Sequence, residues 1–338
     1  MPAALSICIP THDGRARELD RLLESIARQW DGLPGGVVEV CISDNGSQDA
    51  TQDVLARHAE RFGDALVMSR FPDDRGFTAN LLQAVALGQG GHCWLMGSDD
   101  EIEPGGVGTV LDILARHPDR SGLTLNRRNV DDEDPTIVVL DDPRVLPPPG
   151  RITYDRAEDV FGELAMLQDY ISTQVIRRER WKAAVDELGP EGLAAGRLFP
   201  HLVVLGTMIR ADPRWAWVAT PLVRHRVGRE SVKAAVPDGG MTQYTLTVTA
   251  QRAAIWARMF GRRSPLYRRA MGNIWLVQAN PAILADYKAD PAQTYALDVR
   301  LLVSLTRYYW FLPAFWRHSL PVLALPHPLA GLLRRLKG

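Results

Sequence analysis

Two adjacent carboxylates, Asp99 and Asp100, follow directly on an apolar run that extends from His92 to Met96. Such a run is typical of a buried parallel strand, and ligands of open α/β sheets bind outside the carboxyl ends of these strands. Neighbouring carboxylates repel each other unless a cation joins them, and Mg²⁺ or Mn²⁺ commonly binds one or two carboxylates together with substrate phosphates. The pair therefore predicts a metal-dependent enzyme that acts on a nucleotide diphosphate. The plainer interpretation is a solvated turn that ends the strand.

The elements that must position this pair can be read from the apolar pattern. Strands are predicted over residues 5–9, 37–42, 66–68 and 92–96. Apolar residues recur at helical spacing between them, in 19–26, 54–62 and 77–87, and Ser47 is placed to cap the second of these helices. Strands that alternate with helices predict a parallel sheet with crossover helices on its faces.

Polar residues follow three of the predicted strands, at positions 11–13, 44–47 and 98–101. The carboxyl ends of parallel strands meet at one edge of a sheet, so we expect these residues to lie close together. Their convergence is stronger evidence for a site than any one of the three segments.

The later part of the chain has a different pattern. Strands are expected at 123–129 and 137–140, on either side of an acidic loop at 131–134, and a further strand at 215–218. Helices are expected at 158–166 and 179–187, and from about residue 238 the chain is helical in character. We expect an α/β catalytic domain over residues 1–235 and a helical region over residues 236–338 that associates with membranes or forms oligomers.

Composition restricts the class of protein. The 338 residues carry a net charge of −1, without the basic bias of nucleic-acid-binding proteins. Three cysteines without metal-ligand spacing predict buried, reduced thiols. We see no signal peptide at the N-terminus and no uninterrupted apolar stretch of about 18 residues, so a cytoplasmic protein without transmembrane helices is expected.

Four segments carry a family resemblance: Ser6-Ile7-Cys8-Ile9-Pro10-Thr11, Ile42-Ser43-Asp44-Asn45-Gly46-Ser47-Gln48-Asp49-Ala50-Thr51, Arg75-Gly76-Phe77-Thr78-Ala79-Asn80 and Trp94-Leu95-Met96-Gly97-Ser98-Asp99-Asp100. In their order and spacing the chain resembles the family 2 glycosyltransferases over residues 4–230. Within that family it is similar to the abequosyltransferase-like O-antigen enzymes. The resemblance implies a GT-A fold, which is a Rossmann-like, mostly parallel sheet flanked by helices.

The resemblance also implies a nucleotide pocket lined by Pro10, Thr11, Asp13, Asp44, Gly76 and Asn80. Asp44 would accept a hydrogen bond from the base, although a turn or a helix cap also explains an aspartate there. Glycine at position 76 would allow the backbone to approach the nucleotide. The plainer interpretation of Gly76 and Asn80 is an ordinary helix start.

Asp99 and Asp100 correspond to the acidic metal motif of the family. The resemblance implies that Asp100 coordinates Mn²⁺ or Mg²⁺, and that Asp99 contacts the ribose or a water molecule bound to the metal. The cation would neutralise the charge that develops on the departing β-phosphate. Arg224, Arg226 and Arg229 would assist as a mobile cationic loop, because arginine forks match phosphate geometry; the alternative is a solvated basic loop. His225 is a candidate further metal ligand.

The general base is less well marked. Most family members supply an aspartate from a Glu-Asp pair, but this chain has Gly196-Arg197-Leu198-Phe199-Pro200-His201-Leu202 in the corresponding region. His201 is one candidate, because an imidazole titrates near neutral pH; a packed or capping histidine is the plainer interpretation. Asp169 is the rival candidate. Ser172 and Thr173 follow it, in a segment that resembles the acceptor side of the family.

Residues 300–338 contain six basic residues and no acidic ones: Arg300, Arg307, Arg317, Arg334, Arg335 and Lys337. Aromatic residues interleave with them: Tyr308, Tyr309, Trp310, Phe311, Phe315 and Trp316. This mixture suits the interface of an anionic membrane. An aromatic helical pack against the catalytic domain and an oligomer interface are the alternatives.

The leading hypothesis is an inverting glycosyltransferase. It would move a sugar from a nucleotide-diphosphate donor to a lipid-linked saccharide acceptor during surface polysaccharide or O-antigen assembly. One alternative is a sugar nucleotidyltransferase, but residues 5–17 lack the glycine-rich phosphate loop of that class. A second alternative is a non-catalytic scaffold, which the missing Glu-Asp pair favours and the Asp99-Asp100 pair disfavours.

Overall fold

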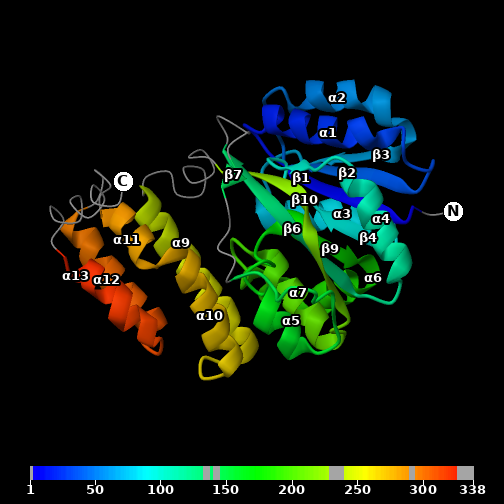
Figure 1. The fold of residues 1–338 in the computed structure, drawn as a ribbon. Helices are drawn as coiled ribbons and strands as arrows, with labels where there is room; N and C mark the ends of the chain where they lie inside the picture. The colour runs from blue at the N-terminus through cyan, green and yellow to red at the C-terminus, as the bar shows by residue number, and fades with distance from the viewer. Residues whose placement is uncertain (1–2, 132–137, 140–144, 228–239, 289–293, 326–338) are drawn as a thin grey trace. The chain divides into compact units, whose positions relative to one another are not determined.

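The computed structural model describes residues 3–131, 138–139, 145–227, 240–288 and 294–325 (Figure 1). The chain divides into two compact units. The first comprises Met1–Leu140, Pro147–Val160 and Leu167–Val227. The second comprises Asp141–Leu146, Phe161–Met166 and Gly228–Gly338. The domain boundary expected near residue 235 lies outside the described residues.

The first unit is a mixed α/β structure around one mostly parallel sheet, as the sequence predicts. Its N-terminal half has four parallel strands in the order β3-β2-β1-β4: β1 (Leu5–Thr11), β2 (Val38–Asp44), β3 (Leu66–Arg70) and β4 (His92–Leu95). Three helices connect these strands: α1 (Ala16–Trp30), α2 (Thr51–Phe62) and α3 (Gly76–Leu87). Leucine, isoleucine and valine side chains of α1 and α2 pack on β1 and β2 in one buried core. Figure 1 shows these two helices on the same face of the sheet.

The sheet continues beyond β4 with strands that come from later in the chain, in the order β9-β6-β10-β5. These are β5 (Glu101–Ile102), β6 (Gly122–Asp131), β9 (Gln174–Arg177) and β10 (Trp215–Val227), with β7 (Val138–Val139) and β8 (Thr153–Tyr154) at the side. β9 is antiparallel to both of its neighbours, β4 and β6, whereas β6 and β10 are parallel. The helices of this half are α4 (Gly106–Arg116), α6 (Arg178–Ala194) and α7 (Pro200–Ala211). Helix α5 (Ala157–Leu164) begins in the first unit and continues into the second from Phe161 onward.

Two local expectations were wrong. Ser47 does not cap α2: the helix starts after Ala50, the Ser47 hydroxyl donates to Asp44, and Asp49 accepts from the amide of Thr51 instead. The last strand does not end at residue 218. β10 continues to Val227 because it pairs with β6 on one side and β5 on the other, with register shifts around Pro221. Residues 132–134 of the expected acidic loop lie outside the described residues.

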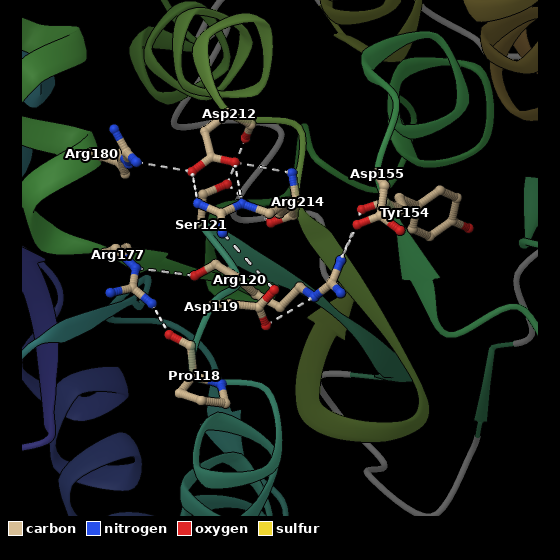
Figure 2. A network of polar contacts seen from close by, with 10 residues as sticks. All are labelled: Pro118, Asp119, Arg120, Ser121, Tyr154, Asp155, Arg177, Arg180, Asp212 and Arg214. Atoms are coloured by element: carbon tan, nitrogen blue, oxygen red, sulfur yellow. Dashed lines mark hydrogen bonds and ion pairs between the residues drawn. The ribbon is translucent and has the colours of Figure 1, made fainter.

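A polar network fastens the sheet edge where β6 and β10 begin (Figure 2). Asp212 accepts two hydrogen bonds from the guanidinium of Arg214, at 2.7 and 2.8 Å, and Arg180 of α6 lies 3.1 Å away. The Ser121 hydroxyl donates to the carbonyl of Asp212 at 2.7 Å. Next to this network, Gly122 leaves room for Trp215, since a Cβ there would lie 2.2 Å from the indole ring. β6 runs parallel to β1, β2 and β4, so this edge is opposite to their carboxyl ends.

The second unit is helical. It contains α9 (Gly240–Phe260), α10 (Pro265–Gln278), α11 (Pro281–Lys288), α12 (Tyr295–Tyr309), a π-helical turn (Phe315–Ser319) and α13 (Leu320–Ala324). Ser264 and Thr294 cap α10 and α12 by accepting backbone N–H groups. Aromatic rings form part of its core, with Phe260 stacked on Trp256 and edge-on to Phe161.

Two absences were expected from the sequence. All three cysteines are buried and none forms a disulfide, which confirms the prediction of reduced thiols. Within the ranges that the structure describes, no helix combines the length and the apolar character needed to cross a bilayer.

Candidate active site

The structure brings the three polar strand ends together. Thr11 and Asp44 lie side by side in the register of β1 and β2. The amide of Met96, at the end of β4, donates to the carbonyl of Cys8 in β1. Arg15, just before α1, forms an ion pair with Asp99 at 3.2 Å. The first, second and fourth strands therefore deliver their polar residues to one edge of the sheet, as the parallel topology requires.

Asp100 is the most strongly engaged group at this edge, with 2% of its surface exposed. Both carboxylate oxygens have partners: Tyr170 donates its hydroxyl to Oδ1 and Ser172 donates its hydroxyl to Oδ2. The Nδ1 atom of His225, on β10, lies 3.1 Å from Oδ1. Three side chains, two from the segment before β9 and one from β10, thus fix the orientation of this carboxylate.

Asp99 lies beside Asp100, and its ionised form is electrostatically disfavoured. Burial raises the pKa of the Asp99 carboxyl, and the charge of Asp100 raises it further. Arg15 and His225 act in the opposite direction. Positive charge at this place stabilises the ionised pair, so a cation between the carboxylates and a substrate would relieve their repulsion.

The donor set fits a hard divalent cation. Gly97 keeps the space beside the carboxylates clear, since a Cβ there would lie 3.0 Å from Oδ1 of Asp99 and 3.2 Å from Oδ2 of Asp100. No cluster of three or more His, Cys, Asp or Glu side chains in the described part of the chain is arranged to hold a metal ion. Two carboxylates suffice for Mg²⁺ or Mn²⁺, however, because water and substrate phosphates complete the coordination.

Tyr170 is a site residue that sequence reasoning missed. Its hydroxyl contacts both Asp100 and His225, its ring packs edge-on to the His225 ring, and the Arg127 guanidinium lies 4.7 Å above it. Burial and the two aspartates raise the pKa of Tyr170 well above its usual value, so the phenol stays protonated and donates. The one sequence feature that pointed to Tyr170 was its position next to the candidate base Asp169. No rule of residue spacing predicts that a tyrosine at that position belongs to a site.

Ser172 and Thr173 were expected to touch acceptor hydroxyls. The Ser172 hydroxyl accepts from the amide of Gly97 at 2.8 Å and donates to Asp100. The Thr173 hydroxyl donates to the carbonyl of Tyr170 at 2.8 Å. Both side chains are buried and bonded within the protein, so their contact with an acceptor stays a prediction.

Asp44 is held by the protein's own donors. It is 1% exposed; Oδ1 accepts from the amide of Ser47 at 3.0 Å, and Oδ2 accepts from Gln52 at 2.6 Å. Arg70 lies 3.3 Å from Oδ2. A nucleotide base that donates to Asp44 would have to share Oδ1 with Ser47, or Oδ2 with Gln52 and Arg70.

The remaining nucleotide-pocket candidates lie around the end of β1. Asn80 donates to the carbonyl of Thr11 at 2.8 Å, and the Thr11 hydroxyl and the Asn80 carbonyl oxygen are buried without a hydrogen-bond partner among the described residues. Buried polar atoms of this kind need a partner, which a ligand can supply. Pro10 is buried in β1. Asp13 accepts from the amide of Gln48 at 2.8 Å and thereby joins the first two strand-end loops.

The backbone conformation of Gly76 is one that favours glycine. Its φ of +78° lies in the left-handed region, and nothing approaches within 4 Å of the position of a Cβ. The start of α3 therefore requires this backbone conformation, and the approach of a nucleotide to Gly76 stays a prediction.

The arginines near the end of β10 do not form a loop. Arg224 pairs in register with Arg128 on β6 and Glu101 on β5, so the expectation of a mobile cationic loop was wrong for this segment. The Arg226 guanidinium donates twice to Glu101, at 2.5 and 2.8 Å. Its contact with a phosphate stays a prediction. Arg229 lies outside the described residues.

The two candidate bases lie next to each other. His201, at the second position of α7, is 3% exposed, and its Nε2 lies 2.9 Å from the backbone carbonyl of Asp169. This contact connects the histidine to the main chain of Asp169. Which of the two takes a proton stays a prediction.

Comparison with known proteins places this site in a family. The model of "Glycosyl transferase family 2" matches residues 6–159. Abequosyltransferase RfbV of Salmonella typhimurium is 27% identical over 227 residues, which are 60% of this chain and 60% of that protein. Validoxylamine A glucosyltransferase of Streptomyces hygroscopicus subsp. jinggangensis is 41% identical over 73 residues, 22% of this chain and 16% of that protein. The chain therefore matches less than two thirds of the length of either relative.

Solved structures show the same fold. TarS 1–349 of S. aureus in complex with UDP has a TM-score of 0.57 at 13% identity, over 93% of this chain and 81% of that one. The mannosyltransferase PcManGT of Pyrobaculum calidifontis, in complex with GDP-Man and Mn²⁺, has a TM-score of 0.52 at 17% identity, over 99% of this chain and 88% of that one. The fold is that of the GT-A glycosyltransferases, as the motifs imply. The part of the chain that carries the carboxylate pair, residues 6–159, therefore matches glycosyl transferase family 2.

Proposed function

We propose that this protein is an inverting, metal-dependent glycosyltransferase that transfers a sugar from a nucleotide-diphosphate donor to a saccharide acceptor. The observation that carries the proposal is the Asp99-Asp100 pair at the carboxyl end of β4, of which Asp100 is buried. Arg15, Tyr170, Ser172 and His225 hold the pair in place. The match of residues 6–159 to glycosyl transferase family 2 favours transfer over nucleotidyl chemistry, so the sugar nucleotidyltransferase alternative is dropped.

Asp100 would hold Mn²⁺ or Mg²⁺, with Asp99 beside it. When bound, the cation supplies charge neutralisation at the departing diphosphate. PcManGT, which shares the fold, is seen with GDP-Man and Mn²⁺. The chain's own residues orient Asp100 through the hydroxyls of Tyr170 and Ser172. They keep that carboxylate out of bulk water, where an ionic contact is weaker.

Inversion needs one group that accepts the proton of the attacking hydroxyl. His201 and Asp169 are the two candidates, and they lie next to each other. We propose that one of them acts as the general base. The scaffold hypothesis remains the second candidate function, because the Glu-Asp pair of the family is missing from residues 196–202.

The resemblance to an abequosyltransferase favours an acceptor in surface polysaccharide or O-antigen assembly. We propose that this acceptor is lipid-linked, for example a polyprenyl-diphosphate oligosaccharide, and that the protein works on it from the cytoplasm at the inner face of the cell membrane.

Thermal unfolding with UDP, GDP, CDP and dTDP, each with and without Mn²⁺, tests the donor site. A ligand that binds only the native state raises Tm, because it increases the free energy of unfolding by about 2.7 kcal/mol at a concentration of 100 Kd. We expect one nucleotide to raise Tm in the wild type only when Mn²⁺ is present, and to have no such effect on Asp100→Ala. An equal shift in Asp100→Ala, or no shift with any of the four, would contradict the proposed role of the pair.

A further inference from the structure

Helix α12 turns one of its faces to solvent although that face is largely apolar. Leu301, Leu305 and Tyr309 are buried against the other helices of the second unit. The opposite side consists of residues three or four positions apart, which line up on a helix: Tyr295, Val299, Arg300, Val303, Arg307 and Trp310. Exposure reaches 84% for Tyr295, 62% for Val303 and 60% for Trp310. We call these six residues the α12 face.

Further aromatic residues extend the α12 face at its C-terminal end. Trp316 is 44% exposed, and its indole N–H donates to the carbonyl of Trp310 at 2.6 Å. Phe311 lies edge-on to Trp310, and the guanidinium of Arg268 on α10 lies 5.8 Å above the Phe311 ring. These contacts tie the end of α12 to the start of α10, where Arg262 and Arg263 are exposed.

The charge around this surface has one sign. Residues 299–325 contain no aspartate or glutamate, and neither do residues 239–285. The nearest carboxylate along the helix is that of Asp298, whose side chain is 12% exposed and pairs with the buried Lys288 at 3.1 Å. Arg300 and Arg307 of the α12 face are exposed. Neither residues 299–325 nor residues 239–285 provide an acidic neighbour for them.

We propose that the α12 face docks the protein on an anionic lipid bilayer. Arginine side chains would bind headgroup phosphates, while Trp310 and Trp316 lie at the level of the interface, where an amphipathic aromatic ring is favoured. A helix with an apolar face and basic flanks lies in the plane of such an interface. A second copy of this chain is a poorer occupant, because a two-fold interface would bring Arg300 and Arg307 against their own counterparts.

The face is tested by co-sedimentation of the full chain with vesicles of phosphatidylcholine, with or without phosphatidylglycerol. We expect binding to the phosphatidylglycerol vesicles only, and loss of that binding at high salt, because screening weakens surface charge. The double variant Arg300→Gln/Arg307→Gln should bind about 30-fold more weakly, since each arginine near the surface contributes about 1 kcal/mol. Trp310→Ser/Trp316→Ser should also lose binding.

Matched controls lie in the first unit. Arg28 is an exposed arginine, and Ile152 is an apolar residue that is 57% exposed. We expect Arg28→Gln and Ile152→Ser to bind vesicles like the wild type. Circular dichroism and Tm establish that every variant is folded.

Three results would overturn the proposal. The first is the absence of binding to phosphatidylglycerol vesicles, and the second is an equal loss of binding in the control variants. The third is a dimer in light scattering that the Trp310→Ser/Trp316→Ser variant dissociates, which would show that a second copy covers the face. The inference does not depend on the proposed transfer reaction: Asp100→Ala should bind vesicles normally even though it loses the nucleotide response.

Discussion

Tyr170 joins parts of the candidate active site that come from three separate elements. Its hydroxyl reaches Asp100 after β4 and His225 on β10, and its ring supports Arg127 on β6. A side chain that orients a metal-binding carboxylate affects metal affinity without touching the metal. We therefore assign Tyr170 a positioning role, together with Ser172.

The change Tyr170→Phe removes the hydroxyl and keeps the ring. We expect Mn²⁺ affinity, measured by electron paramagnetic resonance of the free ion in the presence of the nucleotide, to fall about 10- to 100-fold, as for other partners of metal ligands. Tyr154→Phe is the matched control, because Tyr154 is a fully buried tyrosine of the same unit that lies on β8. Unchanged Mn²⁺ affinity in a folded Tyr170→Phe protein would show that the tyrosine only packs.

At the scale of elements, the sheet is fastened at the edge opposite the site. Asp212, just after α7, connects to Arg214 before β10 and to Arg180 of α6 (Figure 2). The hydrogen bonds from Arg214 are the main reason that the pKa of Asp212 lies below its usual value. A carboxylate whose pKa is lower in the folded state stabilises the protein above its unfolded pKa, and this stabilisation is lost as the pH falls through the folded pKa.

We expect Asp212→Asn to lower Tm at neutral pH, because the ion pairs are lost and Arg214 and Arg180 keep their charge. The difference from the wild type should shrink below about pH 4, the ordinary pKa of an aspartate, where the wild-type carboxyl also becomes neutral. Asp155→Asn serves as the control: Asp155 pairs with Arg120 at 2.6 Å but is 65% exposed, and exposed pairs contribute little. A Tm difference that stays constant down to the acid end would rule out the ionised carboxylate as its cause.

At the scale of the whole molecule, charge is separated along the chain. Residues 228–338 contain 15 lysines and arginines against five aspartates and glutamates, whereas residues 1–227 contain 24 against 35. The net charge of −1 conceals this separation. A basic region suits an anionic surface. Under the proposed function, the acidic region would need cations to bring phosphates to its carboxylates.

Much of the first unit could be predicted from local pattern. The strands β1, β2 and β4 appear in the sequence as apolar runs, and the helices between them as apolar residues at helical spacing. The meeting of Thr11, Asp44 and Asp99 at one edge followed from parallel topology alone. These inferences need only short-range periodicity and the handedness of connections.

The rest depends on long-range pairing. β9 enters the sheet between β4 and β6 in antiparallel direction, and only this places Tyr170 and Ser172 on Asp100, about 70 residues away in the chain. Likewise, the pairing of β10 with β5 sets Arg226 against Glu101. The local sequence does not distinguish an arginine that binds a substrate phosphate from one that pairs with a carboxylate of the protein itself.

The most direct test of the central claim is hydrolysis of the donor sugar in the absence of an acceptor. We would measure release of the nucleoside diphosphate from UDP-, GDP-, CDP- and dTDP-sugars, with Mn²⁺ or with a chelator, in the wild type and in Asp100→Asn. We expect slow turnover of one donor class that the chelator abolishes and that Asp100→Asn reduces by about 10²-fold or more. Turnover that survives both the chelator and the substitution would contradict a metal-dependent transferase built on Asp99 and Asp100.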